Sequence, residues 1–123
     1  MGYYSDIRVS TTKEGFEFIK RVSEGLLEKS GSNKKSLIGR CNYTVDVSDE
    51  NGIVFGWDCV KWYREFQEVN AIMNALSLAD LANIPLQYCE VGEDNDTDFW
   101  ESDTALKLHH YIEPLCKINI YNR

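Results

Sequence analysis

Residues 41–60 read CNYTVDVSDENGIVFGWDCV, which is the pattern of two β-strands joined by a tight turn. Apolar and polar side chains alternate over residues 41–47, as they do in a strand with one buried face. Asn51-Gly52 then supplies a dipeptide typical of two-residue hairpin turns. Residues 53–60 are apolar at consecutive positions near their start. We therefore predict an antiparallel hairpin whose second strand is covered on both faces.

Upstream of this hairpin, the sequence predicts a strand followed by a helix. Apolar and polar residues alternate over residues 5–10, which favours a strand. Apolar residues then recur at helical spacing from about residue 12 to residue 29, with charged residues on the opposite face. Thr11 with Glu14 fits a capping box at the start of this helix. The polar residues 30–36 that follow are typical of a loop.

Downstream of the hairpin, the sequence predicts a second amphipathic helix and further strands. The helical spacing of apolar residues continues either to Ser77 or to Leu81, and Ile84-Pro85 ends the helix in either case. Residues 86–91 favour a fourth strand that enters an acidic turn at Gly92. A fifth and a sixth strand are predicted at residues 106–112 and 115–121.

These elements predict one α+β domain over residues 1–123, in which a mainly antiparallel sheet of five or six strands carries two amphipathic helices on one face. The order of the strands cannot be read from the sequence. A hydrophobic content of 43% and an aromatic content of 12% are typical of a folded chain. Because the sequence has no long apolar run and no secretory signal, we expect a cytosolic protein without membrane contact.

Four cysteines, Cys41, Cys59, Cys89 and Cys116, are spread along the chain. They include no CxxC pair, so neither a zinc knuckle nor a thioredoxin-like redox site is indicated. Their neighbours are largely apolar. We therefore expect buried, reduced cysteines that pack as small hydrophobic residues, as in a reducing compartment.

The distribution of charge points most directly to a function. The formal net charge is −7, but residues 41–103 alone hold fourteen Asp or Glu against Lys61 and Arg64, a net charge of −12. Residues 90–103 carry seven acids and no base. A negative field repels nucleic acid phosphates and attracts basic protein surfaces, including surfaces that themselves bind nucleic acid. We therefore predict a basic protein partner and no direct nucleic acid binding.

The predicted partner-binding residues all lie in this acidic run. Its carboxylates would take the place of nucleic acid phosphates, and its two adjacent aromatic side chains would anchor the complex. The alternative for the aromatic pair is that it folds back and packs in the core. The carboxylates belong to Glu90, Glu93, Asp94, Asp96, Asp98, Glu101 and Asp103, and the aromatic residues are Phe99 and Trp100.

Motifs for catalysis or metal binding are weak. Residues 94–98 resemble the opening of a calcium loop, but Phe99 and Ala105 stand where that loop needs Gly and Glu. His109 and His110 are adjacent, and on a strand they would point to opposite faces. No GxSxG, GxGxxG or GxxxxGK motif occurs. We therefore predict no enzyme activity, no cofactor and no metal site. A cation-binding protein or enzyme that uses the acidic run remains an alternative.

A basic cluster lies outside the acidic run, around residues 30–40. It favours either a contact with nucleic acid or an acidic partner, or simply a solvated loop. The pI of about 4.8 argues against nucleic acid binding. The cluster consists of Lys29, Lys34, Lys35 and Arg40, close in sequence to Lys20 and Arg21.

Three different short motifs occur along the chain. They are Met1–Ser5 in an opening strand, Val60-Lys61-Trp62-Tyr63 with Glu68-Val69 around a helix start, and Val91–Asp94 in a Gly-Glu-Asp turn. Together these segments resemble a group of small, uncharacterised proteins encoded by phages and prophages. The resemblance implies no catalytic residues. It implies a context, because phage genomes are rich in small acidic proteins that disable host defence nucleases, among them anti-CRISPR proteins that mimic nucleic acid charge.

We therefore expect a small acidic, non-enzymatic binding protein of the host cell cytosol. The favoured interpretation is a phage-encoded, anti-CRISPR-like inhibitor that docks a nucleic-acid-mimicking face on the basic channel of a defence effector. A second is an immunity protein or antitoxin that neutralises a basic nuclease toxin, and a third is a metal-binding protein or enzyme. A fourth is an accessory phage protein whose charge only keeps it soluble. The sequence does not predict the oligomeric state or the identity of the partner.

Overall fold

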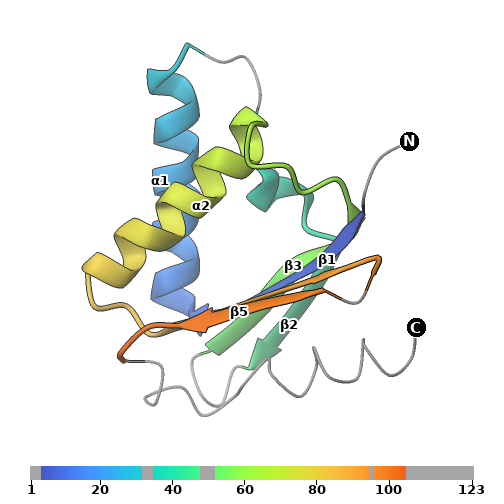
Figure 1. Ribbon diagram of the computed structural model, residues 1–123. Coiled ribbons are helices and arrows are strands. Elements are labelled where there is room, and N and C mark those ends of the chain that lie inside the picture. Colours follow the sequence, from blue (N-terminus) through green and yellow to red (C-terminus); the bar gives the residue numbers. More distant parts are fainter. Residues whose placement is uncertain (1–3, 32–34, 48–51, 95, 105–123) are drawn as a thin grey trace.

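The computed structural model describes residues 4–31, 35–47, 52–94 and 96–104 (Figure 1). Within these residues the chain forms five strands, two α-helices and one short 3-10 helix. In chain order they are β1 (Ser5–Thr12), α1 (Lys13–Lys29), the 3-10 helix η1 (Leu37–Arg40), β2 (Tyr43–Val47), β3 (Gly52–Val60), α2 (Gln67–Leu81), β4 (Leu86–Gly92) and β5 (Thr97–Glu101).

All described strand pairs are antiparallel, and they form one sheet in the order β2-β3-β1-β4-β5. Both helices lie on the same side of this sheet, as Figure 1 shows. The predicted α+β class, with a mainly antiparallel sheet and two helices on one face, is therefore confirmed. β1 lies at the centre because it pairs with β3 on one side and with β4 on the other.

Four of the described strands correspond to predicted strands, and the fifth does not. β5 lies inside the acidic run, where the sequence predicted a turn. The strands predicted at 106–112 and 115–121 lie outside the described residues. α2 extends to Leu81, the longer of its two predicted ends.

The hairpin of β2 and β3 forms as predicted, with Tyr43 opposite Gly56, although its connecting residues 48–51 lie outside the described part of the chain. Residues 52–57 are all buried, so the expectation that both faces of β3 are covered is confirmed. Glycine is required at position 56 because a Cβ atom there would overlap the carbonyl oxygen of Ile7 on β1. This close approach fixes how the hairpin joins the central strand.

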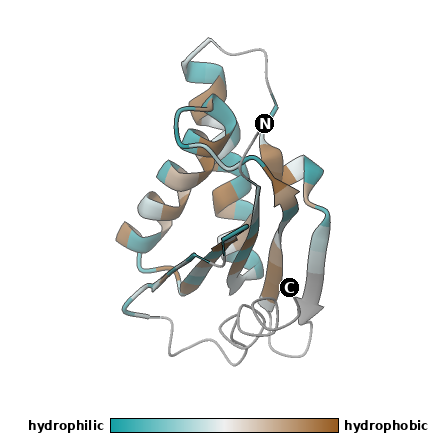
Figure 2. Ribbon diagram, turned by 45° about the vertical axis from the view of Figure 1, so that its right-hand side comes forward, coloured by the Kyte–Doolittle hydropathy of each residue, from teal (hydrophilic) through white to brown (hydrophobic). Residues whose placement is uncertain are grey.

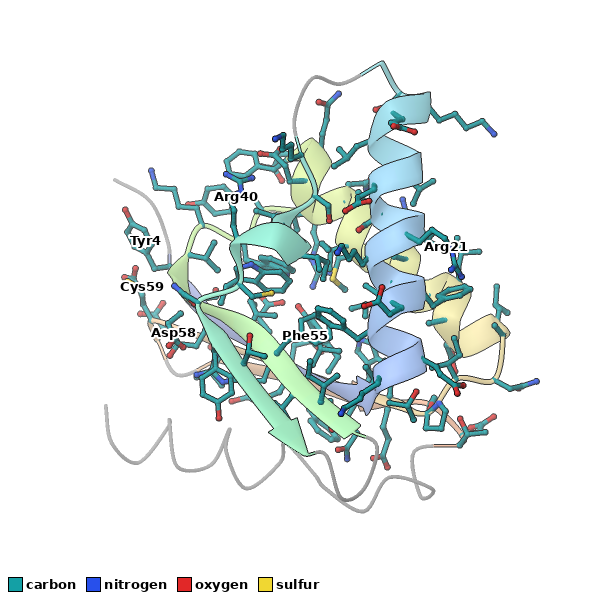
Figure 3. The ribbon with its side chains drawn as sticks, turned by 180° about the vertical axis from the view of Figure 1, so that it is seen from behind. Tyr4, Arg21, Arg40, Phe55, Asp58 and Cys59 are labelled. Atoms are coloured by element: carbon teal, nitrogen blue, oxygen red, sulfur yellow. The ribbon has the colours of Figure 1, made fainter. Side chains whose placement is uncertain are left out.

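The main core lies between the sheet and the helices and is rich in aromatic residues. Phe55 of β3 lies on the side of the sheet that faces α1 (Figure 3), and its ring meets that of Phe16 edge-on, 5.0 Å between centroids. The ring centroids of Trp57 and Trp62 lie 5.0 Å apart, and this contact ties the segment before α2 to the sheet. Figure 2 shows hydrophobic residues concentrated in the central strands and on parts of both helices. The helices therefore cover the sheet with their apolar sides, as their periodicity predicts.

α1 is capped by a different residue from the one predicted. Thr12 is the N-cap, and its side chain accepts a hydrogen bond from the backbone N–H of Gly15 (2.9 Å). Thr11 is fully buried in β1, where its hydroxyl donates to the carbonyl oxygen of Pro85 (2.7 Å). The predicted capping box of Thr11 with Glu14 is therefore wrong, because the strand continues through Thr11.

The face of the sheet away from the helices has a second buried cluster, which contains Val54 and Cys89. Arg8 lies on this face and is only 5% exposed. Its Nη2 atom lies 2.6 Å from Asp58 Oδ1, and its guanidinium stacks over the ring of Tyr43 at 3.6 Å from the centroid. A buried arginine needs such partners, because an unpaired buried charge is costly.

The cysteines depart from the prediction in two ways. Cys59 is exposed and free, and Cys41 is partly buried and free. Cys89 is fully buried but disulfide-bonded, while Cys116 lies outside the described residues. The expectation of buried, reduced cysteines is therefore wrong for Cys59 and for Cys89. Cys59 lies at the end of β3 (Figure 3) and is exposed because the chain turns there. Its backbone takes a positive φ of 55°, and its N–H donates to Asp6 Oδ1 (2.9 Å).

Candidate functional site at the acidic edge of the sheet

The acidic run is positioned by the hairpin of β4 and β5. The two strands pair antiparallel, with Cys89 opposite Phe99 and Glu90 opposite Asp98. β5 is the last strand in the order of the described sheet, so the acidic run forms an edge of that sheet. Side chains alternate between the faces of a strand, so the two acids of β5, Asp98 and Glu101, point to opposite faces.

Six of the seven predicted carboxylates are exposed, and they lie along β5 or at its two ends. Two belong to β5 itself, three precede it and one follows it. The acidic edge, as we define it, consists of Glu93, Asp94, Asp96, Asp98, Glu101 and Asp103. These carboxylates therefore follow one edge of the sheet, although their side chains point to both of its faces.

Glu90 stands apart from the acidic edge. Its Oε1 atom accepts a hydrogen bond from the Tyr88 hydroxyl (2.6 Å) and an ion-paired hydrogen bond from Arg64 Nη2 (3.0 Å). The side chain is only 22% exposed. Arg64 Nη2 also lies 3.8 Å from Asp98 Oδ2, so one cation is shared between β4 and β5. Glu90 therefore acts within the fold and presents little free charge to a partner.

Two carboxylates of the acidic edge are held by neutral donors. Glu93 Oε1 accepts a hydrogen bond from the backbone N–H of Tyr4 (2.7 Å), and Glu101 Oε2 accepts one from Gln87 Nε2 (3.0 Å). A neutral donor orients a carboxylate without cancelling its charge. Both side chains therefore stay available as fixed negative groups at the surface.

The sequence left open whether Phe99 and Trp100 anchor a partner or pack in the core, and the structure gives the two residues different positions. Trp100 points toward the helices, where its ring stacks on that of Tyr88 at 5.8 Å between centroids. Phe99 points to the opposite face and is 36% exposed. Phe99 is therefore the aromatic side chain that a partner can reach, while Trp100 anchors β5 to the core.

The side chain of Tyr88 connects the core to Glu90. Its hydroxyl accepts from Trp62 Nε1 (2.9 Å) and donates to Glu90, so it occupies the middle of a hydrogen-bonded chain. Burial is the main cause that raises the pKa of Tyr88, and the hydrogen bond to Glu90 raises it further. Tyr88 is therefore a protonated donor at any physiological pH, which keeps Glu90 fixed.

The basic cluster around residues 30–40 has an acidic neighbour. Lys35 and Arg40 line a surface hollow of about 460 Å³ together with Glu68, and Arg40 Nη2 lies 4.0 Å from Glu68 Oε2. Lys34 lies outside the described residues. A hollow with mixed charge does not favour nucleic acid phosphates, so this cluster is the weaker candidate.

Metal-binding chemistry finds little support in the described part of the chain. No three His, Cys, Asp or Glu side chains in residues 4–31, 35–47, 52–94 and 96–104 come together as metal ligands would. His109 and His110 lie outside these residues. No helix in them combines the length and apolarity needed to cross a bilayer.

The sequence did not reveal three residues that shape this site: Arg64, Tyr88 and Tyr4. Arg64 is one of two basic residues in a strongly acidic stretch, and its isolation was a usable signal that it serves as an internal counter-ion. No sequence signal connects Tyr4 to Glu93, because they meet only through the pairing of β1 with β4.

Comparison with known proteins adds no relative: no protein-family model matches the chain, and no curated protein or solved structure is significantly similar to it. The geometry of the acidic edge is therefore the basis for a functional proposal.

Proposed function

We propose that the protein is a non-enzymatic binding protein that docks its acidic edge on the basic, nucleic-acid-binding surface of another protein. The supporting observation is the row of six exposed carboxylates along β5 and its two ends. Opposite charge accelerates the encounter of two proteins, and the exposed ring of Phe99 supplies an apolar contact once they meet. Occupation of the basic surface would exclude nucleic acid from it.

The resemblance to phage proteins favours an inhibitor of a bacterial defence nuclease, acting in the host cell cytosol. Disulfides are rare in the cytosol, so the Cys89 disulfide bears on this proposal. An action in the cytosol requires that binding survive reduction. We expect the same affinity for the partner with and without dithiothreitol, and a loss of binding on reduction would contradict a cytosolic role.

Capture from a bacterial lysate on the immobilised chain, followed by mass spectrometry, identifies the partner. We expect basic nucleic-acid-binding proteins to be enriched. A captured defence effector supports the inhibitor, and a captured toxin nuclease supports an immunity protein instead. If the captured proteins are neither basic nor nucleic-acid-binding, the proposal is wrong.

Matched charge reversals then test the acidic edge on the purified partner. Asp94, Asp96 and Asp103 are changed together to lysine, because Asp98 contacts Arg64 and its reversal would disturb the fold. The control changes Glu17, Glu24 and Glu28 to lysine, three exposed residues of α1. Both variants carry the same change in charge.

We expect the acidic-edge variant to bind more weakly by about tenfold or more, and the α1 variant to bind nearly as the parent chain does. Thermal unfolding of both variants confirms that they fold. If the two variants lose affinity equally, net charge alone drives binding. If neither loses affinity, the acidic edge is not the docking surface.

A further inference from the structure

Backbone hydrogen bonds at the two ends of the β4–β5 hairpin fix which residues of β5 face β4. The Ser102 N–H donates to the Leu86 carbonyl oxygen (2.9 Å), and the Gly92 N–H donates to the Asp96 carbonyl oxygen (2.8 Å). Hydrogen-bonded and non-hydrogen-bonded pairs alternate along an antiparallel ladder. The even-numbered residues of β5 therefore turn their backbone groups toward β4, and its odd-numbered residues turn theirs outward.

Phe99 and Glu101 are two of these outward-turned residues. They lie opposite Cys89 and Gln87 in pairs of the non-hydrogen-bonded kind. β5 ends the sheet, and no described strand pairs with its outer side. The N–H and C=O groups of Phe99 and Glu101 therefore point away from the sheet at an edge whose side chains are largely exposed. Such an edge is a template for one more strand.

We infer that the partner docks by adding an extended segment that carries lysine or arginine to the outer edge of β5, so that the sheet gains a strand. This inference rests on the proposed function and specifies how the acidic edge is recognised. Backbone hydrogen bonds supply affinity in this mode of binding, and side chains at alternate positions supply specificity.

The side chains of β5 define what that segment must carry. Residues directly opposite each other in an antiparallel pair have Cβ atoms about 4.5–5.5 Å apart. A basic side chain opposite Asp98 or Glu101 is within reach of an ion pair, and an apolar side chain opposite Phe99 covers the exposed ring. Asp96 and Asp103 extend the negative charge past both ends of the strand.

A second copy of this chain does not meet these requirements. Pairing of two β5 strands would bring the acidic edge of each chain against that of the other. Like charges across a sheet are destabilising. We therefore expect the chain to remain monomeric in sedimentation velocity at low salt. A dimer that Glu101→Pro dissociates would contradict the inference, because the occupant of the β5 edge would then be a second copy of this chain.

Two fluorescein-labelled peptides of equal charge test strand addition. One alternates lysine with valine, and the other alternates lysine with proline, which lacks the N–H that a strand must donate. We expect the lysine–valine peptide to bind more tightly by about tenfold or more, because it pairs with the backbone of β5. Equal affinities in fluorescence anisotropy would show that charge alone binds the peptides.

Substitutions at Glu101 separate the backbone from the side chain. Glu101→Pro removes an N–H that points outward, which an edge strand tolerates, and Glu101→Ala removes only the carboxylate with its hydrogen bond to Gln87. We expect Glu101→Pro to abolish the preference for the lysine–valine peptide and Glu101→Ala to keep it. A preference that survives in Glu101→Pro would contradict the inference.

Amide hydrogen exchange gives the same test in the unaltered chain. We expect the amides of Phe99 and Glu101 to exchange rapidly in the free protein and to slow by about tenfold or more when the lysine–valine peptide saturates it. The amides of Asp98 and Trp100 are expected to be slow in both states. Unchanged exchange at Phe99 and Glu101 would overturn strand addition.

Failure of this inference and failure of the proposed function give different results. If the captured partner is lost by the lysine variant of Asp94, Asp96 and Asp103 but kept by Glu101→Pro, the acidic edge binds without strand addition. If both variants keep the partner, the function itself is wrong.

Discussion

Replacing Tyr88 by phenylalanine removes one hydroxyl from the hydrogen-bonded chain that links the core to Glu90. That hydroxyl accepts a hydrogen bond from Trp62 Nε1 (2.9 Å) and donates one to Glu90 Oε1 (2.6 Å). Tyr88 is fully buried and Trp62 is 5% exposed, so the Trp62 N–H has no access to bulk water as a replacement acceptor. The change leaves the ring and its stacking on Trp100 in place.

The expected cost follows from these two hydrogen bonds. A buried donor left without an acceptor costs about 1–3 kcal/mol, and a hydrogen bond to a charged group contributes about 1.5–3 kcal/mol. The hydrogen bond to Glu90 contributes at the low end of its range, because Glu90 is 22% exposed and keeps its contact with Arg64. We expect the free energy of unfolding to fall by about 2–4 kcal/mol, which lowers Tm by roughly 10 °C in a domain of this size.

Urea unfolding followed by tryptophan fluorescence measures this loss, with Tyr4→Phe as the matched control. Tyr4 is 37% exposed, so removal of its hydroxyl is expected to change the free energy of unfolding by less than about 0.5 kcal/mol. A loss below about 0.5 kcal/mol in Tyr88→Phe would refute the reasoning, because it would mean that the buried hydrogen bonds contribute nothing net.

The difference between parent and Tyr88→Phe also depends on pH. Burial and the hydrogen bond to Glu90 raise the pKa of Tyr88 above the value of about 10 expected for an unfolded tyrosine. A group whose pKa is raised by folding stabilises the fold below the unfolded pKa and loses that contribution as the pH rises. We therefore expect the advantage of the parent chain to be complete below about pH 10 and to shrink above it.

Three further predictions concern glycine, cysteine and charge. Gly56→Ala is expected to prevent stable folding, because its Cβ would overlap the backbone of β1. Gly25→Ala lies on an open helix surface and is expected to stabilise the chain by up to about 1 kcal/mol. Urea unfolding compares the two variants. Burial raises the pKa of Cys41 from 9.0 to about 11, so at pH 9 its thiolate fraction is about fiftyfold below that of a thiol with a pKa of 9.0. Peptide mapping should therefore find iodoacetamide on the exposed Cys59 well before it reacts with Cys41. Equal rates of reaction would contradict the burial of Cys41. Arg64→Gln removes the positive charge beside Glu90 and Asp98, so stopped-flow measurements with the captured partner should show faster association, and slower association would place Arg64 in the contact instead.

Periodicity in the sequence predicted the elements whose apolar residues recur regularly. The strand β3 and the helix from Lys13 to Lys29 follow directly from the spacing of their apolar residues. The helix buries one apolar stripe, and the first part of β3 is buried on both faces. The cap of α1 was missed by one residue, because Thr11 and Thr12 are both competent caps. Only the continuation of β1 decides between them.

β5 and Arg8 were not predictable from local pattern. Charged residues surround Phe99 and Trp100, so the strand signal of these two aromatic residues was masked by a composition typical of turns. Arg8 occupies a polar position in an alternating strand, yet it is buried against Tyr43 and Asp58. Its burial depends on cross-strand neighbours, which follow from the strand order and not from the sequence of β1.

The acidic edge was predicted as a group of carboxylates but not as an arrangement. Composition identified all six exposed residues, since a run of acids without bases is normally solvated. The separation of Glu90 from the rest depends on Tyr88, two residues away on β4, and on Arg64, which reaches Glu90 only after β4 and the segment before α2 come together.

Competition between the chain and nucleic acid for the captured partner tests the central claim most directly. Labelled duplex DNA is bound to the purified partner, and the unlabelled chain is added while fluorescence anisotropy is followed. We predict that the parent chain displaces the DNA, that rising salt weakens this displacement, and that the lysine variant of Asp94, Asp96 and Asp103 fails to displace it. A partner that holds DNA and the parent chain at the same time, at every salt concentration, would contradict the claim.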